Sequence, residues 1–291
     1  NRVANLSYTG AMSGTSSSTP LAVFRLSGGV INMGTIAGNI VGDSLVNASI
    51  TYSSNSASSS DFNAFYLSSA GASINMRNNF AGGIEAALNG TGGVRIFGIQ
   101  TAGTTLLDCR FNTIGGPTAN SIQCLSSNSS FVRGIVHNAS TSATISDNII
   151  RNLTSNCSIA GTPNLIGIAI NSTALQTISR NRIYNLTGTT VAAVSTSNVG
   201  IQLWTSTTTG MVSTIDANQI HSMEVSNSSQ PVIGIQLVQG LNTCSNNMIR
   251  LGLKADGTPM IVACELSGFL DELGTLKLFN NSVYIGGTGV S

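Results

Sequence analysis

The sequence predicts an all-β fold, a right-handed parallel β-helix (a solenoid) of about eight rungs with roughly 33 residues in each. Three observations predict it. A short motif around an asparagine recurs along the chain, a glycine–isoleucine pair recurs in phase with it, and almost no segment has the spacing of an amphipathic helix. A fixed period of this length is typical of stacked repeats, in which each unit buries its apolar face against the next.

The asparagine motif consists of an apolar residue, two small or polar residues, Asn, any residue and a second apolar residue. It is clearest in residues 145–150, 178–183, 215–220, 244–249 and 278–283. Weaker copies lie upstream, and the first of them places Ile36 in the leading apolar position. Eight asparagines fall into register: Asn39, Asn79, Asn112, Asn148, Asn181, Asn218, Asn247 and Asn281.

The physical role of these asparagines follows from their spacing. The two apolar residues of the motif are five positions apart, so the alternation of a strand must break once between them. Asparagine tolerates the left-handed backbone region, so we expect the ladder residue itself to adopt a positive φ. Stacked rungs bring equivalent amides to about 4.8 Å, where they can hydrogen-bond along the stack. A ligand-binding row of amides is the alternative, but the apolar neighbours favour an internal ladder.

The second motif predicts a strand in every rung. Glycine precedes isoleucine at positions 98, 134, 167, 200 and 234, and the residues after it alternate, as in Ile168-Ala-Ile170. This alternation is typical of a strand with one buried face. A further strand lies around the asparagine and a third is expected in segments such as 149–153, which makes three strands per rung. The right-handed winding rests on the general rule for parallel crossovers.

Composition restricts the classes of function. Only 8% of the residues are charged, 41% are hydrophobic and the net charge is +1, with the basic residues scattered singly. Scattered basic residues argue against a nucleic-acid partner, and no apolar run is long enough to insert into a membrane. We expect one domain over residues 1–291, with residues 1–20 irregular or forming an incomplete first rung. An extracellular or cell-surface location fits this composition.

The five cysteines divide into two groups. Cys109 and Cys244 occupy the apolar position three residues before a ladder asparagine, and Cys264 aligns with a glycine–isoleucine strand, so we expect all three in the core. Cys124 and Cys157 are 33 residues apart and are expected on adjacent rungs, either as a disulfide or as two stacked thiols. No Cys-x-x-Cys motif or Cys/His cluster is present, so we expect no metal and no cofactor.

Candidate catalytic residues are few, because the chain has only 11 acidic residues. Asp147 and Asp216 lie just before ladder asparagines two rungs apart, and Arg180 lies on the rung between them. Two rungs span about 9.6 Å, so the two carboxylates, together with the arginine, could act on one sugar. The favoured alternative is that all three are polar turn residues beside the asparagine corner. The two histidines, His137 and His221, are expected at the surface.

Three segments carry a resemblance to a known family. Residues 145–154, 178–187 and 280–287, with phrases such as Ile-Ser-Asp-Asn-Ile-Ile-Arg-Asn-Leu-Thr, resemble the repeats of large secreted β-helix proteins of Bacteroidetes-type bacteria. The resemblance implies a surface-exported, adhesin-like protein. Members of that family often carry a C-terminal sorting domain, and no such domain is visible in this sequence.

These observations predict an extracellular structural or adhesive β-helix in preference to an enzyme. The chain begins and ends abruptly, so we expect its partner to be itself, stacked end to end into a filament or sheath, or further rungs of a longer chain. The alternatives are a polysaccharide lyase or glycoside hydrolase and a glycan-binding module without catalysis. Glycans are therefore the other expected partner.

Overall fold

The computed structural model describes residues 1–10, 21–88, 92–126, 130–156, 164–189, 196–205 and 212–287. These residues form 27 β-strands and no helix. No helix in the described ranges is long and apolar enough to cross a membrane.

The strands form two large sheets that face each other, and all strand pairings within them are parallel. Sheet A contains β1 (Arg2–Val3), β2 (Leu6–Gly10), β5 (Ile40–Gly42), β6 (Ile50–Ser54), β8 (Phe80–Gly82), β9 (Ile84–Leu88), β11 (Thr113–Ile114), β12 (Ile122–Cys124), β15 (Ile149–Ser155), β18 (Arg182–Gly188), β21 (Gln219–Val225), β24 (Met248–Leu251) and β27 (Ser282–Ile285).

Sheet B contains the strands of the glycine–isoleucine motif and the short strands that lead into the asparagine corner. They are β3 (Leu21–Ser27), β4 (Ile31–Met33), β7 (Ser60–Arg77), β10 (Val94–Arg110), β13 (Phe131–Ala139), β14 (Ala143–Ser146), β16 (Leu165–Ser172), β17 (Gln176–Ser179), β19 (Asn198–Thr205), β20 (Val212–Asp216), β22 (Val232–Gln239), β23 (Leu241–Ser245), β25 (Leu266–Asp271) and β26 (Thr275–Phe279).

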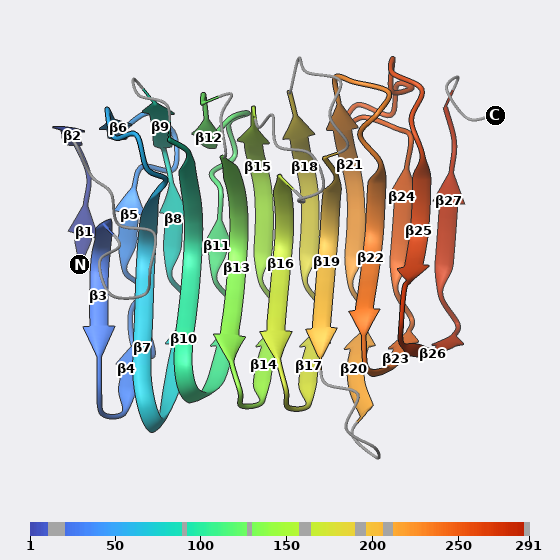
Figure 1. Cartoon of the computed structure of the whole chain (residues 1–291), viewed down its shortest axis with the longest axis horizontal. Helices are drawn as coiled ribbons and strands as arrows, with labels where there is room; N and C mark the ends of the chain where they lie inside the picture. The colour runs from blue at the N-terminus through green and yellow to red at the C-terminus, as the bar shows by residue number, and fades with distance from the viewer. Residues whose placement is uncertain are drawn as a thin grey trace.

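A typical rung consists of three strands, which confirms the prediction. β13 runs along sheet B, β14 continues in the same sheet to the asparagine corner, and β15 returns through sheet A. In Figure 1 the sheet B strands β13 to β22 run down the near side, while β15 to β21 run up the far side as the chain advances from left to right. This winding is right-handed, as expected for parallel crossovers. β1 and β2 pair with β5 and β6, so residues 1–10 also belong to sheet A.

The core lies between the two sheets. Isoleucines on both sides of the ladder asparagines fill it, and Ile145, Ile150, Ile178 and Ile183 have no exposed surface. Cys109 and Cys244 are also fully buried there, as expected. The first copy of the motif differs from the prediction, because Ile36 is fully exposed while Met33, paired with Met76, occupies the core position. Glycine at position 34, with φ +75°, turns the chain away directly after Met33.

The glycine of each glycine–isoleucine pair allows close approach of the sheets. A Cβ added to Gly167 would lie 2.6 Å from the carbonyl oxygen of Gly200 and 2.7 Å from Cγ2 of Ile183 in the opposite sheet. Gly134, Gly200 and Gly234 meet the same two kinds of atom at 2.5–2.8 Å. Packing therefore requires glycine here, because an isoleucine of sheet A occupies the space that a side chain would need.

Candidate functional site

The ladder asparagines form a continuous row of hydrogen bonds. Asn181 Nδ2 donates to Oδ1 of Asn218 at 3.0 Å and to the carbonyl of Ile145 at 2.9 Å. Its own Oδ1 accepts from the backbone N–H of Asn148 at 3.1 Å and from that residue's Nδ2 at 3.0 Å. The side-chain links run from Asn39 to Asn281, and Asn1 donates into the same row at 2.8 Å.

This geometry supports the structural interpretation of the ladder. The amides of Asn79, Asn112, Asn148, Asn181, Asn218 and Asn247 are at most 1% exposed. Each of these six donates to the next rung and to a carbonyl of the previous rung, and accepts from the previous asparagine. Because their donors and acceptors are already used within the stack, these amides have no capacity left for a ligand.

The expectation of a positive φ at the ladder asparagine is wrong. In seven rungs the residue directly before it adopts the left-handed conformation, with φ between +51° and +59°: Asn78, Phe111, Asp147, Arg180, Ala217, Asn246 and Asn280. The residue before the asparagine therefore interrupts the inward–outward alternation of the strand. As a result, the asparagine side chain points into the solenoid. Since aromatic, charged and small residues all occupy the left-handed position, the residue type there is not dictated by the backbone.

Asp147 and Arg180, two of the candidate catalytic residues, form an ion pair, whereas Asp216 is held by neutral hydrogen-bond donors. Arg180 donates from Nε and Nη2 to the two carboxylate oxygens of Asp147 at 2.7 and 2.8 Å. These bonds hold the pKa of Asp147 below its usual range. Asp216 accepts from Ser245 Oγ at 2.6 Å and Asn246 Nδ2 at 2.9 Å. A general acid needs a raised pKa, whereas the pKa of Asp147 is lowered, so Asp147 is poorly suited to that role.

The strands that lead into the asparagine corner carry a further acid between two arginines. Arg77 and Arg110 both pair with the carboxylate of Asp108, one rung before Asp147. The charge of Arg110 also contributes to the lowered pKa of Asp147. Acids and arginines thus alternate along the corner, which neutralises most of the charge of the candidate catalytic group.

The predicted disulfide stays a prediction, because Cys157 lies outside the described residues. Cys124 is fully buried, and the residue beside it on the next rung is Ser155.

The surface position predicted for His137 is wrong. Its side chain is fully buried, with Nδ1 2.8 Å from Thr101 Oγ1 and Nε2 2.9 Å from the carbonyl of Thr141. In the strand register it shares its column with inward-pointing Ile170, and burial lowers its pKa.

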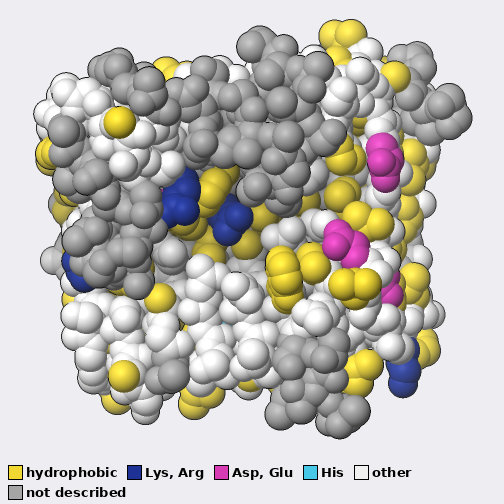
Figure 2. All heavy atoms as spheres, viewed as in Figure 1, with side chains coloured by type: hydrophobic (Ala, Val, Ile, Leu, Met, Phe, Trp, Pro, Cys, Tyr) yellow, Lys and Arg dark blue, Asp and Glu magenta, His cyan; other side chains and the backbone are white. Residues whose placement is uncertain are grey.

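The outer face of sheet B carries a second apolar cluster, separate from the core. Its buried members are Phe97, Val136, Ile166, Ala169, Val199 and Ile233. Figure 2 shows a hollow on this face with an apolar floor and basic side chains beside it. Arg133 lies 4.3 Å from the ring centre of neighbouring Phe131, and Arg95 pairs with buried Asp61. Burial raises the pKa of Asp61 and lowers that of Arg133 to about 10.

Further along this face a hollow of about 360 Å³ opens beside Trp204. Three side chains from successive rungs form a polar chain along it: Gln202 donates to Gln236 at 2.9 Å, and Gln236 donates to Glu272 at 2.6 Å. Trp204 is 53% exposed, and its Nε1 donates to Gln239 at 2.8 Å. An anchored aromatic face beside amides and a carboxylate is suited to a ligand with both apolar faces and hydroxyl groups.

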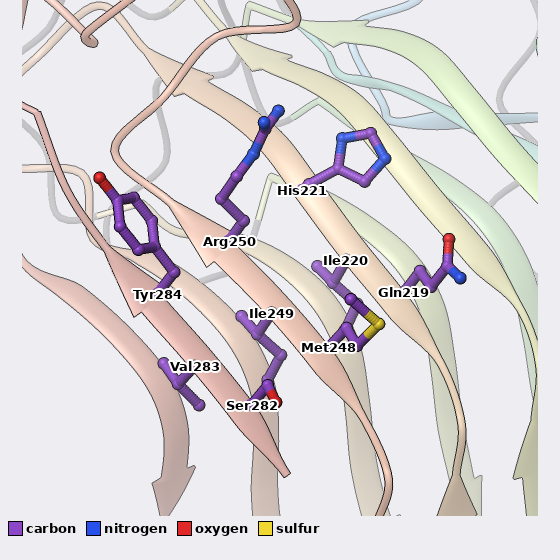
Figure 3. A pocket seen from close by; sticks show the side chains of 9 residues that line it. All are labelled: Gln219, Ile220, His221, Met248, Ile249, Arg250, Ser282, Val283 and Tyr284. Carbon is purple, nitrogen blue, oxygen red and sulfur yellow. The ribbon is translucent and has the colours of Figure 1, made fainter. Parts of the chain in front are cut away.

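The outer face of sheet A carries a column of aromatic and basic side chains. Tyr184 and His221 stack in parallel with ring centres 5.0 Å apart, and Arg250 follows on the next strand. Figure 3 shows His221, Arg250 and Tyr284 projecting side by side from three adjacent strands. They line a hollow of about 430 Å³. Burial lowers the pKa of His221, and the charges of Arg250 and Arg182 lower it further, which favours a neutral ring.

The sequence did not predict the hollow beside Trp204 or the column on sheet A. A signal for the hollow is present in the glycine–isoleucine strands, where Gln202 and Gln236 occupy equivalent outward positions on adjacent rungs. Within the described ranges no group of three His, Cys, Asp or Glu side chains is arranged to hold a metal ion. In comparisons with known proteins, no family model, no curated protein and no solved structure matches this chain.

Proposed function

We propose that the chain is an extracellular structural and adhesive β-solenoid that binds a neutral glycan in the hollow beside Trp204. The observation that carries this proposal is the arrangement of Trp204 beside the chain Gln202–Gln236–Glu272. A pyranose presents an apolar face to an aromatic ring and a rim of hydroxyl groups to amides and carboxylates.

The spacing of this site fits a sugar chain. Gln202, Gln236 and Glu272 come from successive rungs, which are about 4.8 Å apart. A pyranose ring is comparable in length to that step, about 5 Å, so successive hydroxyl groups meet successive polar side chains. Among the described residues the carboxylate of Glu272 accepts one hydrogen bond, from Gln236, and it retains capacity to accept from a hydroxyl.

The solenoid supplies a rigid platform for such binding. Trp204 lies on β19, which pairs with β16 and β22 and lies over the core. The indole is held by Gln239, so less rotamer freedom is lost when a ligand packs against it. Binding residues on packed strands are positioned more accurately than residues on loops.

Catalysis by Asp61, Asp108 or Asp147 is disfavoured because each of these acids is paired with an arginine. Asp147 is paired with Arg180, and Asp108 with two arginines. Asp61, whose pKa is raised, is almost completely buried against Arg95. A glycosidase needs two carboxylates that both reach the scissile bond. The acids named here are instead held by arginines in stable pairs.

Binding to a panel of immobilised neutral glycans tests the proposal. We expect the purified chain to bind a subset of them, and Trp204→Ala to weaken that binding at least about tenfold, which corresponds to 1.4 kcal/mol. Phe111→Ala is the matched control, since Phe111 is 54% exposed and lies at the asparagine corner. Circular dichroism confirms that each variant is folded. Absence of binding by the folded wild type, or equal loss in both variants, would overturn the proposal.

End-to-end assembly stays a separate prediction. Sedimentation velocity at increasing concentration tests it: growth into long particles supports a filament, and a constant monomer contradicts it.

A further inference from the structure

We propose that the outer face of sheet A is a second binding surface, for a linear acidic polysaccharide, with Arg151, Arg182 and Arg250 as its cationic contacts. It differs from the hollow beside Trp204 in the sheet that carries it and in the charge of its ligand. The two proposals therefore stand independently.

The strand register aligns the side chains of this surface. Arg151, Tyr184, His221, Arg250 and Tyr284 are direct partners across β15, β18, β21, β24 and β27. Arg182 lies two residues before Tyr184 on the same strand and is exposed. In Figure 3 the last three members of the column project on one side of the sheet. Residues that are 29–37 positions apart in sequence thus form one continuous stripe.

The charge of this stripe is not neutralised by the protein. Among the described residues Arg2, Arg77, Arg95, Arg110, Arg180 and Lys254 all pair with carboxylates. No ion pair is found for Arg151, Arg182 or Arg250 within the same ranges. Glu224, the acidic side chain on β21, lies 3.8 Å from Lys254. Three positive charges on one face therefore lack a counter-charge from the described chain, which favours an anionic ligand.

Hydrogen bonds hold two of these guanidinium groups in place. Arg151 Nη1 donates to the hydroxyl of Tyr184 at 3.0 Å and its Nε to the carbonyl of Gly115 at 3.3 Å. Arg250 Nη2 donates to Ser222 Oγ at 3.1 Å. A guanidinium has five N–H donors, so these bonds leave others to meet carboxylate or sulfate oxygens. A cation that is already positioned loses less side-chain entropy on binding.

The spacing of the charges fits a polymer that lies across the strands. Arg151 and Arg250 are three rungs apart, about 14 Å, and Arg182 lies on a rung between them. A polysaccharide with an anionic group on every sugar, or on alternate sugars, presents charges at similar intervals. The hollow lined by His221, Met248, Arg250 and Tyr284 provides about 430 Å³ for one segment of it.

The ring geometry favours a polysaccharide over single-stranded nucleic acid. Nucleic acid binds such surfaces by stacking bases on open aromatic faces. Tyr184 has one face against His221, with the planes 9° apart, and the guanidinium of Arg182 lies 5.6 Å from its ring centre. These contacts cover one face of Tyr184 and place a guanidinium beside its ring, which leaves less of that ring open to a stacking base. Recognition therefore depends on charge and hydrogen bonding, which suits a ligand without stacking bases.

Binding measurements with defined polymers test this inference. The purified chain is titrated with polygalacturonate, dextran sulfate, neutral dextran and a single-stranded oligonucleotide with a matched number of charges. We expect binding to polygalacturonate or dextran sulfate, and the tighter of the two assigns a carboxylate or sulfate ligand. Neutral dextran should not bind at this surface, and affinity should fall with salt. Failure of both acidic polymers, or tighter binding of the oligonucleotide, would overturn the inference.

Two exposed basic residues provide matched variants. Arg182→Gln removes a charge from the stripe, and Lys277→Gln removes one from β26 in the other sheet. We expect Arg182→Gln to weaken polyanion binding at least about threefold and to reduce the salt slope by about one ionic contact. Lys277→Gln should have less than half that effect on log affinity. Equal effects would indicate unspecific attraction and contradict the site. Trp204→Ala should leave polyanion binding unchanged, which separates this result from the test of the neutral glycan site.

Discussion

Asn148 and Asn181 are joined by two hydrogen bonds that end on the same atom. Oδ1 of Asn181 accepts from the backbone N–H of Asn148 at 3.1 Å and from its Nδ2 at 3.0 Å. One side chain therefore satisfies both a main-chain donor and an amide of the rung before it. Because this pattern repeats, the loss of one amide leaves buried groups unsatisfied on both neighbouring rungs.

Replacement of Asn181 should therefore be costly. We expect Asn181→Ala to lower the free energy of unfolding by about 2–4 kcal/mol, because each unsatisfied buried group costs about 1–3 kcal/mol. Urea unfolding followed by circular dichroism measures the change. Asn171→Ala is the control at an exposed position of β16, where a change within about 0.5 kcal/mol is expected. Equal stability of the two variants would show that the ladder does not support the fold.

The glycine column gives a prediction about packing. Gly167→Ala should destabilise the protein by at least about 2 kcal/mol, since the new Cβ would lie 2.6 Å from a backbone oxygen and 2.7 Å from Ile183. Gly257→Ala serves for comparison: no atom lies within 4 Å of its Cβ position, and only its φ of +83° opposes the change. We expect thermal unfolding to show the larger loss for Gly167→Ala. The reverse order would refute the role assigned to the glycine column.

Buried His137 should make stability depend on pH. Its pKa is lowered by burial, so below the ordinary value of 6.5 the unfolded chain binds a proton more readily than the folded one. Stability should therefore be highest above pH 6.5 and should fall as the pH decreases from there toward the lowered pKa. Denaturant titrations between pH 8 and about pH 5 measure this fall.

His137→Gln should flatten that pH profile, since glutamine is neutral throughout and can still hydrogen-bond. His221→Gln is the comparison, because the pKa of His221 is also lowered but its ring is only half-buried. We expect the larger part of the acid-dependent loss to disappear with His137→Gln. An unchanged profile in that variant would mean that the buried imidazole is not the group responsible.

The ion pair of Asp147 and Arg180 predicts a small, salt-sensitive effect on stability. Its lowered pKa means that Asp147 contributes stability above its ordinary pKa, and that this contribution is lost as pH falls through the lowered value. Asp147→Asn should thus be slightly less stable than wild type at neutral pH and equal to it in strong acid. Its glycan binding should be unchanged. Loss of a sugar-cleaving activity in this variant would instead restore the catalytic interpretation.

The periodic features of the molecule could be predicted from the sequence because every rung repeats them. The ladder asparagines, the core positions of Cys109 and Cys244 and the three strands per rung all follow from the spacing. The positive φ was assigned to the wrong residue because Phe111 or Arg180 gives no sign of a left-handed conformation. Spacing defines a corner but does not show which residue of the corner turns.

The binding surfaces depend on residues that do not repeat. Trp204 occurs once, at a position held by Asn171 on the rung before, so no periodic signal marks it. Arg151 and Arg250 are far apart in sequence and looked like scattered charges, although three steps of strand register bring them into one column. Charges that are dispersed along a solenoid sequence can gather on its surface, and they must be judged on the stacked rungs.

Trp204 is the single tryptophan of the chain, so its fluorescence reports directly on the proposed glycan site. The most direct test of glycan binding is a fluorescence titration of the folded protein with the neutral glycans that it binds on the panel. We predict a saturable change in emission whose midpoint agrees with the affinity from an independent binding measurement, and which Phe111→Ala retains. Tight binding of a neutral glycan with no change in the emission of Trp204 would contradict the account.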